Sequence, residues 1–283
     1  MSVFYLAIDA KTLIHVGYLF DADNASLEPE MTIVIEENII SDVVAGYISP
    51  ETDDLYIDLT GYYILPGLID MHVHLTSQSS SKAYIERTTL NSADYAIRAT
   101  KNAEKTLLAG FTSVRNLGDA DSITISLRNA INNGVTFGPR IFSSGTTIST
   151  TGGHGDPTNS LNLTFTSDPG PREGVINGKE DAYKAVRHRY KQDADLIKIT
   201  ATGGVLSNAK NGQNPQMTVD EIKAIVASAK DYGFKVAAHA HGSEGIKRAT
   251  LAGVDSIEHG TLMDKEGASL MRERGTYYVP TLL

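Results

Sequence analysis

Histidines follow directly on short apolar segments at several places in this chain. His72 and His74 form an H-x-H pair after the run Ile64–Met71, and the segment Pro66–Asp70 strengthens the pattern. In a β-strand, residues i and i+2 point to the same side, so the two imidazoles of this pair face one point. Two convergent imidazoles favour a site for a first-row transition metal.

A lysine within an apolar segment is a second unusual feature. Lys198 lies in the middle of Leu196–Thr200. A buried ammonium group is costly, and desolvation lowers the pKa of its amine. A neutral amine can react with CO₂ to give a carbamate, which is an anionic oxygen ligand able to bridge two cations. The alternative is an interior lysine paired with a carboxylate, but histidines at the other strand ends favour the ligand.

Three further histidines come late in the chain. His239 ends the apolar run Lys235–His239, and His259 follows Ser256–Glu258. Each of these two adds one imidazole to the same end of a sheet of parallel strands. His241 repeats the same-side spacing but falls where the chain is expected to leave the strand, so we interpret it as a substrate contact rather than a ligand. Any one of these histidines could be a core or surface residue, whereas four at strand ends are hard to obtain by chance.

The segment Ser144–Gly178 is long and rich in glycine. Long loops in compact domains are often functional lids, and we expect His154 in this loop to contact the substrate. The alternative is a mobile surface loop. Thr202–Val205 is expected to make room beside the metal site. Neither loop has the spacing of a phosphate-binding P-loop.

Strands that alternate with amphipathic helices are expected to position these side chains. Continuous apolar runs are typical of parallel strands that are buried on both faces. Thr218 and Glu221 predict the start of a helix by their capping-box spacing. Repeated β-α alternation of this length indicates an α/β fold with a (β/α)₈ TIM barrel. Seven strands are expected, at Ile64–Met71, Thr112–Arg115, Arg140–Ser143, Leu196–Thr200, Lys235–His239, Ser256–Glu258 and Tyr277–Val279, with helices that include Ala93–Leu108, Lys179–Gln192, Val219–Tyr232 and Ser243–Ala252.

Residues 1–62 contain short runs typical of β-strands, whereas in residues 63–283 such runs alternate with helical segments. Residues 1–62 predict a small antiparallel sheet that forms part of an N-terminal β-sandwich, and Glu37-Asn38 is expected to be a hairpin turn. Residues 63–283 predict the (β/α) barrel. The strands of the first region are expected at Val3–Ile8, Leu13–Leu19, Met31–Glu36, Ile39–Val44 and Tyr56–Leu59.

The barrel is expected to be incomplete, because a (β/α)₈ barrel needs eight strands and residues 63–283 supply seven. We therefore expect at least one further β/α unit beyond Leu283. An intact seven-stranded open barrel is the alternative, and it would leave two strand edges unpaired. Such edges could also let the chain form a homo-oligomer.

Composition limits the class of protein. The 283-residue chain has no Cys, so disulfides and thiolate metal sites are excluded. Its net charge of −9 and its pI of about 5.3 argue against a nucleic-acid partner. No run of 18 apolar residues is present, and the N-terminus does not look like a signal peptide, so we expect no membrane partner and a cytoplasmic location.

Taken together, these segments resemble the amidohydrolase superfamily of metal-dependent hydrolases. The subgroup most similar contains imidazolonepropionase-like proteins and Xaa-Pro or Xaa-Arg dipeptidases. The matching stretches follow the family order along nearly the whole chain. They are Leu65–His74, Gly110–Arg115, Gly152–Gly155, Ile197–Ile199, His239–Gly242 and Ser256–Gly260.

The resemblance implies a distorted (β/α)₈ barrel, a small β-sandwich built from both chain termini, and two divalent metal ions, usually zinc. It implies that His72 and His74 bind one metal, that His239 and His259 bind the other, and that carboxylated Lys198 bridges them. His154 and His241 would contact the carboxylate of the substrate. The family places a metal-binding, proton-shuttling Asp at the end of strand eight, which lies beyond Leu283, so the catalytic residue is not assigned.

The function expected from the resemblance is hydrolysis of a C–N bond, in an amide or a dipeptide, by a metal-activated hydroxide. The substrate would be a small molecule or a dipeptide. One alternative is a hydrolase of the same superfamily that acts on a cyclic amide or an imidazolone. The other is a non-catalytic metal-binding barrel fragment.

Overall fold

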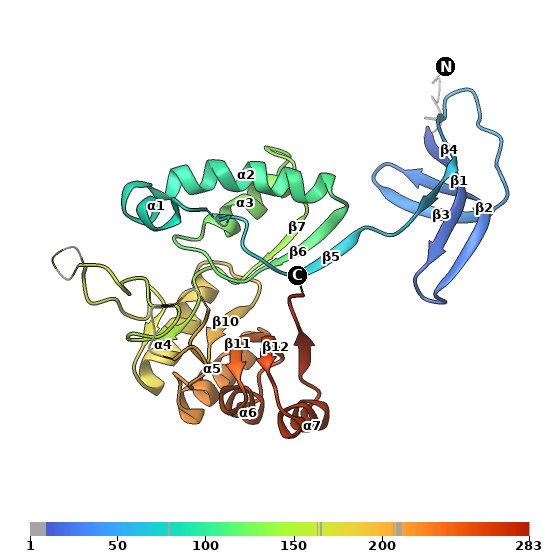
Figure 1. Cartoon of the computed structure of the whole chain (residues 1–283). Coiled ribbons are helices and arrows are strands. Elements are labelled where there is room, and N and C mark those ends of the chain that lie inside the picture. The colour runs from blue at the N-terminus through green and yellow to red at the C-terminus, as the bar shows by residue number, and fades with distance from the viewer. Residues whose placement is uncertain are drawn as a thin grey trace, which may run out of the picture. The chain divides into compact units, whose positions relative to one another are not determined.

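The computed structural model divides the chain into two compact units (Figure 1). The first unit ends at Gly67 and the second begins at Leu68. The expected strand Val3–Ile8 lies outside the described residues. The structure describes residues 10–78, 80–162, 164, 166–205, 207 and 211–282.

The first unit contains one four-stranded sheet in the order β3-β2-β1-β4. Its strands are β1 (Lys11–Asp21), β2 (Ser26–Glu36), β3 (Ile39–Ala45) and β4 (Leu55–Ile64). The hairpin turn at Glu37-Asn38 is confirmed, and Glu37 has a φ of 55° there. The expectation of an antiparallel sheet is wrong for β4, which pairs with β1 in parallel. The reason is the connection after β3, which leads from one edge of the sheet to the opposite edge.

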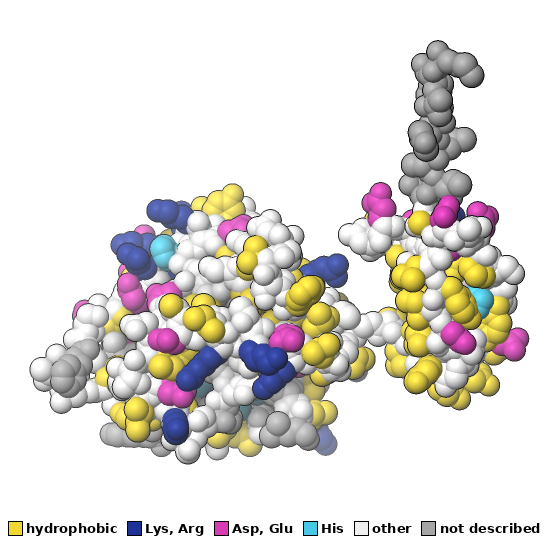
Figure 2. Space-filling model, turned by 90° about the horizontal axis from the view of Figure 1, so that it is seen from above, with side chains coloured by type: hydrophobic (Ala, Val, Ile, Leu, Met, Phe, Trp, Pro, Cys, Tyr) yellow, Lys and Arg dark blue, Asp and Glu magenta, His cyan; other side chains and the backbone are white. Residues whose placement is uncertain are grey.

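The core of the first unit is small. Val16 is fully buried, and Leu13, Ile33 and Val34 are at most 7% exposed. Many other apolar side chains stay at the surface, including Leu55 at 60%. Figure 2 shows these yellow side chains over the smaller lobe. The described residues of this unit form one sheet, so a sandwich of two sheets stays a prediction.

The second unit is built from parallel strands and covering helices. The sheet β5-β6-β7 comprises β5 (Leu68–Val73), β6 (Phe111–Asn116) and β7 (Arg140–Ser143). The sheet β10-β11-β12-β13 comprises β10 (Ile197–Thr200), β11 (Val236–Gly242), β12 (Ser256–Leu262) and β13 (Tyr277–Val279). Two short strands, β8 (Ser149–Thr150) and β9 (Val175–Ile176), pair with each other and were not expected.

All seven strands predicted for the barrel region are present, but β11 and β12 extend further than predicted, to Gly242 and Leu262, and the first strand has different bounds. The predicted strand Ile64–Met71 joins the last residue of β4 to the first part of β5. Leu65-Pro66-Gly67 separates the two strands, because proline has no N–H for a ladder and favours strand ends. The first β/α strand therefore begins at Leu68 and reaches Val73.

The two parallel sheets are joined by backbone hydrogen bonds. Ile148 forms a parallel bridge with Ile199, and the N–H of Asp195 donates to the carbonyl of Ser143 over 2.8 Å. At the far edges, β5 and β13 each have one strand neighbour among the described residues. The strands thus form one curved parallel array that is not closed in the described part of the chain.

Seven helices connect the strands of the described second unit and lie outside its sheets (Figure 1). The start of α5 at Thr218 and Glu221 is a capping box, as predicted. The longest helix has 17 residues, and within the described residues no helix has both the length and the apolar character needed to cross a membrane. The helices are α1 (Ala83–Thr89), α2 (Ser92–Leu108), α3 (Ile123–Asn132), α4 (Lys179–Lys191), α5 (Val219–Asp231), α6 (Ser243–Ala252) and α7 (Lys265–Arg274).

The main core lies between the sheet β10–β13 and its helices. Ile197 and Ile199 of β10 and Ile257 of β12 are fully buried in it, together with Ile222 and Ile225 of α5. A smaller core lies under the sheet β5–β7, where Val114 and Ile141 pack against α2 and α3. The two sheets are therefore supported by cores of very different extent.

Candidate metal centre

The seven side chains predicted for the site line a single hollow of about 430 Å³. They come from the carboxyl ends of β5, β11 and β12, from β10, and from the loop that contains His154. Parallel strands place their carboxyl ends on the same side of a sheet, which is where barrel folds build sites. The hollow is lined by His72, His74, His154, Lys198, His239, His241 and His259, together with Leu117, Thr147, Gly155, Thr200, Val205 and Thr281.

His72 in β5 and His74 directly after it have different hydrogen-bond partners and burial. The side chain of His72 is 6% exposed, and its Nδ1 lies 3.0 Å from Oε2 of Glu258. His74 is exposed, and its Nδ1 lies 3.3 Å from the carbonyl oxygen of Gly118. Their ring centroids are 5.3 Å apart, so the pair converges as the H-x-H spacing predicts.

Three histidines of the second sheet are closer still. One ring nitrogen of each of His239, His241 and His259 lies within 4.8 Å of the other two. The expectation that the chain leaves the strand before His241 is wrong, because β11 continues to Gly242, which pairs with Leu262 after a register shift. His241 therefore stands among the candidate ligands by distance. The ring of His259 also lies 4.7 Å from that of His72, which joins the two groups.

His154 packs onto this cluster from the long loop. Its ring stacks on His239 with centroids 4.4 Å apart. Gly204 provides the space for this ring, because a Cβ at that position would lie 2.5 Å from Cε1 of His154. Within Thr202–Val205, which was predicted to make room at the site, Gly204 is thus the residue whose missing side chain leaves space for His154. Nδ1 of His154 is buried and has no hydrogen-bond partner among the described residues.

Lys198 is buried in β10, with 3% of its surface exposed. Burial lowers the pKa of its amine to about 7, and the charge of Arg115 adds to this effect while that of Glu258 opposes it. Within the described residues Lys198 forms no ion pair, since the carboxylate of Glu258 is engaged by Arg115 and His72. The described geometry therefore does not favour the alternative, in which Lys198 is paired directly with a carboxylate.

Burial also keeps the imidazoles neutral. It is the largest cause that lowers the pKa of His154 to about 4 and that of His259 to about 3, and the charge of Lys198 adds to it. The pKa values of His72 and His241 are lowered for the same first reason. A histidine must be neutral to bind a metal, so the cluster holds its donors in the state that a cation requires.

Apart from His154, each imidazole of the site has one ring nitrogen hydrogen-bonded to a protein oxygen. The acceptor or partner is Glu258 for His72 and a backbone carbonyl for His74 and His239. Nδ1 of His241 and Nδ1 of His259 are each hydrogen-bonded to a threonine hydroxyl, with 2.9 Å between nitrogen and oxygen in both cases. One nitrogen of each ring is thus oriented while the other is left to a cation, as is usual for metal ligands. Neutral imidazoles and a neutral amine fit divalent first-row cations such as Zn²⁺.

The sequence interpretation missed Glu258 and Arg115. Glu258 has no exposed surface, and Arg115 binds it through Nη2 at 2.7 Å. Both are charged residues inside short apolar strands, which was the signal used for Lys198 and could have marked each of them as a candidate, although not as partners of one another. Their contacts reach His72 directly.

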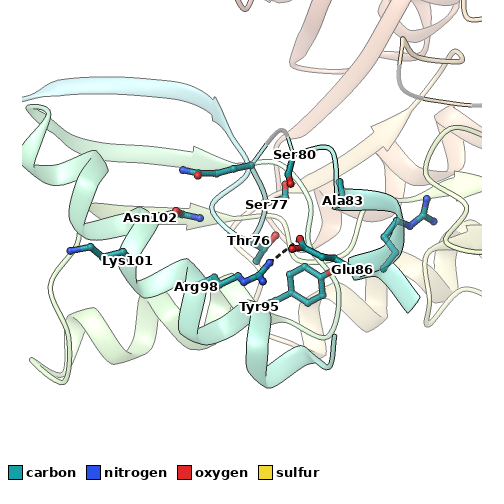
Figure 3. A pocket seen from close by; sticks show the side chains of 11 residues that line it. Thr76, Ser77, Ser80, Ala83, Glu86, Tyr95, Arg98, Lys101 and Asn102 are labelled. Carbon is teal, nitrogen blue, oxygen red and sulfur yellow. Dashed lines mark hydrogen bonds and ion pairs between the residues drawn. The ribbon is translucent and has the colours of Figure 1, made fainter. Parts of the chain in front are cut away.

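Another hollow, of about 450 Å³, lies beside α1 and α2 (Figure 3). Thr76, Ser77 and Ser80 line one part of it, and an ion pair of 2.9 Å joins Arg98 to Glu86. None of the seven predicted site residues lines this hollow. The candidate chemistry therefore belongs to the histidine-lined hollow.

Comparison with known proteins identifies the family of the chain. A profile described as "Amidohydrolase family" matches residues 63–283. A solved Xaa-Pro dipeptidase with methionine bound in its active site is 55% identical, with a TM-score of 0.92 over 96% of this chain and 67% of that one. A solved prolidase complexed with N-methylphosphonate-L-proline is 35% identical, with a TM-score of 0.86 over 96% of this chain and 66% of that one.

A curated relative, ochratoxinase of Aspergillus niger, is 31% identical over 290 residues. The aligned region covers 95% of this chain and 58% of the relative. The chain thus spans somewhat more than half the length of this curated relative.

Proposed function

The chain belongs to the amidohydrolase family, and we propose that it forms the metal-binding part of a hydrolase that cleaves a C–N bond in an amide or a dipeptide. The observation that carries the proposal is the convergence of six imidazoles and the buried Lys198 on one hollow of about 430 Å³. The similarity to an Xaa-Pro dipeptidase and a prolidase supports a dipeptide as the substrate.

Two divalent metal ions, with zinc as the first choice, would be held by side chains of both sheets. His72 and His74 would hold one, and His239 and His259 would hold the other. Lys198 would bridge them as a carbamate. In that reaction the neutral amine nitrogen forms a bond to the carbon of CO₂ and releases one proton to solvent. The low pKa of the buried Lys198 amine supports this step, since a neutral amine is the reactive form.

The bound cations would supply Lewis acidity to the scissile carbonyl group and lower the pKa of water. The chain's own residues would bind and orient the substrate beside them. His154 and His241 would contact the carboxylate of a dipeptide, and both line the hollow. Leu117, which is fully buried, would contribute an apolar wall that limits access of water.

The proposed function also implies a fold for the complete site. The seven parallel strands would form part of a (β/α)₈ barrel in which an eighth strand lies between β13 and β5. The bridge between Ile148 and Ile199 supports this arrangement, because it joins the two sheets into one parallel array. The site would then lie at the carboxyl ends of the barrel strands, as in other barrel enzymes.

The test is Lys198→Ala in the full-length protein, with Lys184→Ala as the control. Lys184 is an exposed lysine on α4. We expect Lys198→Ala to abolish hydrolysis and to lower the zinc content measured by mass spectrometry, and Lys184→Ala to change neither. An unchanged zinc stoichiometry in Lys198→Ala would overturn the bridging role. A panel of dipeptides and cyclic amides assayed with the wild type then distinguishes the dipeptidase from a cyclic-amide hydrolase.

A further inference from the structure

A buried carboxylate lies directly behind the metal-site histidines. Glu258 belongs to β12 and has no exposed surface. Its Oε1 accepts hydrogen bonds from Nη2 of Arg115 at 2.7 Å and from the hydroxyl of Ser256 at 2.6 Å. Its Oε2 lies 3.0 Å from Nδ1 of His72. A buried carboxylate is costly unless it is paired and hydrogen-bonded, and here both oxygens are engaged.

These contacts decide which nitrogen of His72 carries the proton. An ionised carboxylate can only accept hydrogen bonds, so Nδ1 of His72 must be the donor. In a neutral imidazole the other nitrogen, Nε2, then has a free lone pair. The carboxylate therefore fixes His72 in the tautomer that can bind a metal through Nε2. Among the described histidines of the site, His72 alone has an ionised side chain as its partner.

The backbone gives His72 less support than a regular strand would. β5 pairs with β6 from Asp70↔Val114 to Val73↔Asn116, and the register shifts between these two pairs. An extra residue thus lies in β5 at the position of Met71 and His72, and a bulge of this kind re-aims side chains. Side-chain contacts are needed to fix the direction of the imidazole.

Arg115 provides those contacts together with Glu258. Its Nε donates to the carbonyl oxygen of Met71 at 2.7 Å, which is the residue before His72. Its Nη1 and Nη2 bind Ser256 and Glu258 on β12. One guanidinium group therefore connects the irregular part of β5 to the second sheet.

We propose that Glu258 is a positioning residue that holds His72 in its metal-binding tautomer and orientation, and that Arg115 holds the carboxylate in place. This inference rests on the proposed function, because it assigns a role to residues behind the same metal site. Substitution of such a partner of a ligating histidine typically costs about 10–100-fold in metal affinity.

The variant that isolates this role is Glu258→Gln, which keeps the size and removes the charge. A glutamine that accepts from Arg115 through its oxygen turns its NH₂ group toward His72. Nδ1 would then have to accept, so the proton would move to Nε2 and block the ligand. We expect Glu258→Gln to bind Zn²⁺ about 10–100-fold more weakly at one of the two sites, and Glu258→Asp to recover part of the loss.

Asp195→Asn is the matched control. Asp195 pairs with Arg128 at 2.7 Å and accepts from the N–H of Ser143, but it stands before β10, at the opposite end of that strand from the site. The affinity is measured by competition between the full-length protein and a zinc chelator. Asp195→Asn should leave both affinities unchanged even where it lowers the thermal midpoint.

A second measurement does not depend on the folding of Glu258→Gln, because it is made on the wild type. Nitrogen-15 spectra of the metal-free wild type, with His72 assigned through His72→Gln, report the tautomer directly. A proton on Nδ1 is the expected result, and a proton on Nε2 overturns the inference. Equal zinc affinities of wild type and Glu258→Gln would also overturn it. A wild type that binds no zinc would instead overturn the proposed function, which keeps the two failures distinct.

Discussion

The two parallel sheets of the second unit contribute to the same site but are built differently. Every residue of β10 is buried, and β11 and β12 lie over a large core that includes Ile199 and Ile257. In β5, by contrast, Leu68 is 48% exposed and Ile69 is 64% exposed. The second sheet is fixed by packing, whereas the irregular part of β5 is fixed by the Arg115–Glu258 contacts.

This difference shows two ways to orient a histidine side chain in the site. The apolar side chains of the second sheet pack closely in the large core, and ring nitrogens of three of its imidazoles lie within 4.8 Å of one another. On β5 a charged pair, Arg115 of the neighbouring β6 and Glu258 of β12 in the other sheet, takes over this role, since the surroundings of β5 supply less packing. The site therefore combines a half that the core supports with a half that side-chain hydrogen bonds support.

The largest expected effect concerns metal retention. A double variant of His72→Ala and His74→Ala should keep about one metal equivalent, because the three imidazoles of the second sheet form a group of their own. A double variant of His239→Ala and His259→Ala should lose the metal of the second sheet. Metal analysis after dialysis against a weak chelator measures both. If the first variant loses all its metal, the second sheet is not an independent half-site.

The second effect is on stability and uses one residue type in both sheets. Ile257→Ala should lower the free energy of unfolding by about 4 kcal/mol, because Ile257 is fully buried and its truncation leaves a cavity. Ile69→Ala should stay within about 0.5 kcal/mol, since Ile69 is 64% exposed. Urea unfolding of both variants gives the comparison. Equal losses would mean that β5 is packed as tightly as β12.

The sequence allowed the residues that line the histidine-lined hollow to be predicted because the signals were local. His72, Lys198, His239 and His259 all stand in or directly after short apolar runs, and parallel strands bring such positions to one end. Apolar runs likewise predicted the seven strands, and the capping-box spacing of Thr218 and Glu221 predicted the start of α5. These features depend on periodicity and on a few turn and cap residues.

Other features depend on contacts between distant segments and were missed. The pairing of Glu258 with Arg115 joins residues 143 positions apart, and neither residue indicates its partner. The parallel entry of β4 beside β1 depends on which edge the preceding connection reaches. The extension of β11 through His241 follows from its pairing with β12 after a register shift. Each of these outcomes is decided by tertiary structure rather than by local propensity.

A third prediction follows from the uncompensated burial of Lys198. Its pKa is lowered from 10.5 to about 7 in the folded chain, so between these pH values the unfolded chain binds a proton that the folded chain does not. Unfolding then takes up a proton, and raising the pH stabilises the fold. Relative to Lys198→Met, the metal-free wild type should gain about 2 kcal/mol of unfolding free energy from pH 7 to pH 9.

This measurement is made by urea unfolding in buffer free of CO₂, so that the amine is not converted to a carbamate. Lys184→Met, at an exposed position of α4, is the control and should show no such dependence. A difference between wild type and Lys198→Met that does not change with pH would mean that Lys198 is solvated or ion-paired, and that the second sheet does not bury an isolated amine.

The smallest effect compares α5, which packs on the large core, with α1, which has no buried residue. In α5, the hydroxyl of Thr218 accepts from the N–H of Glu221 at 3.2 Å, and the Glu221 carboxylate accepts from Thr218 and from the N–H of Gly178 before α4. Thr218→Ala should therefore cost about 1 kcal/mol. Thr88→Ala, at an exposed position of α1, removes only a local hydrogen bond to Ile85 and should stay within about 0.5 kcal/mol. Because α5 packs on the large core and α1 has no buried residue, equal losses in urea unfolding would show that the difference between the two sheets does not extend to their helices.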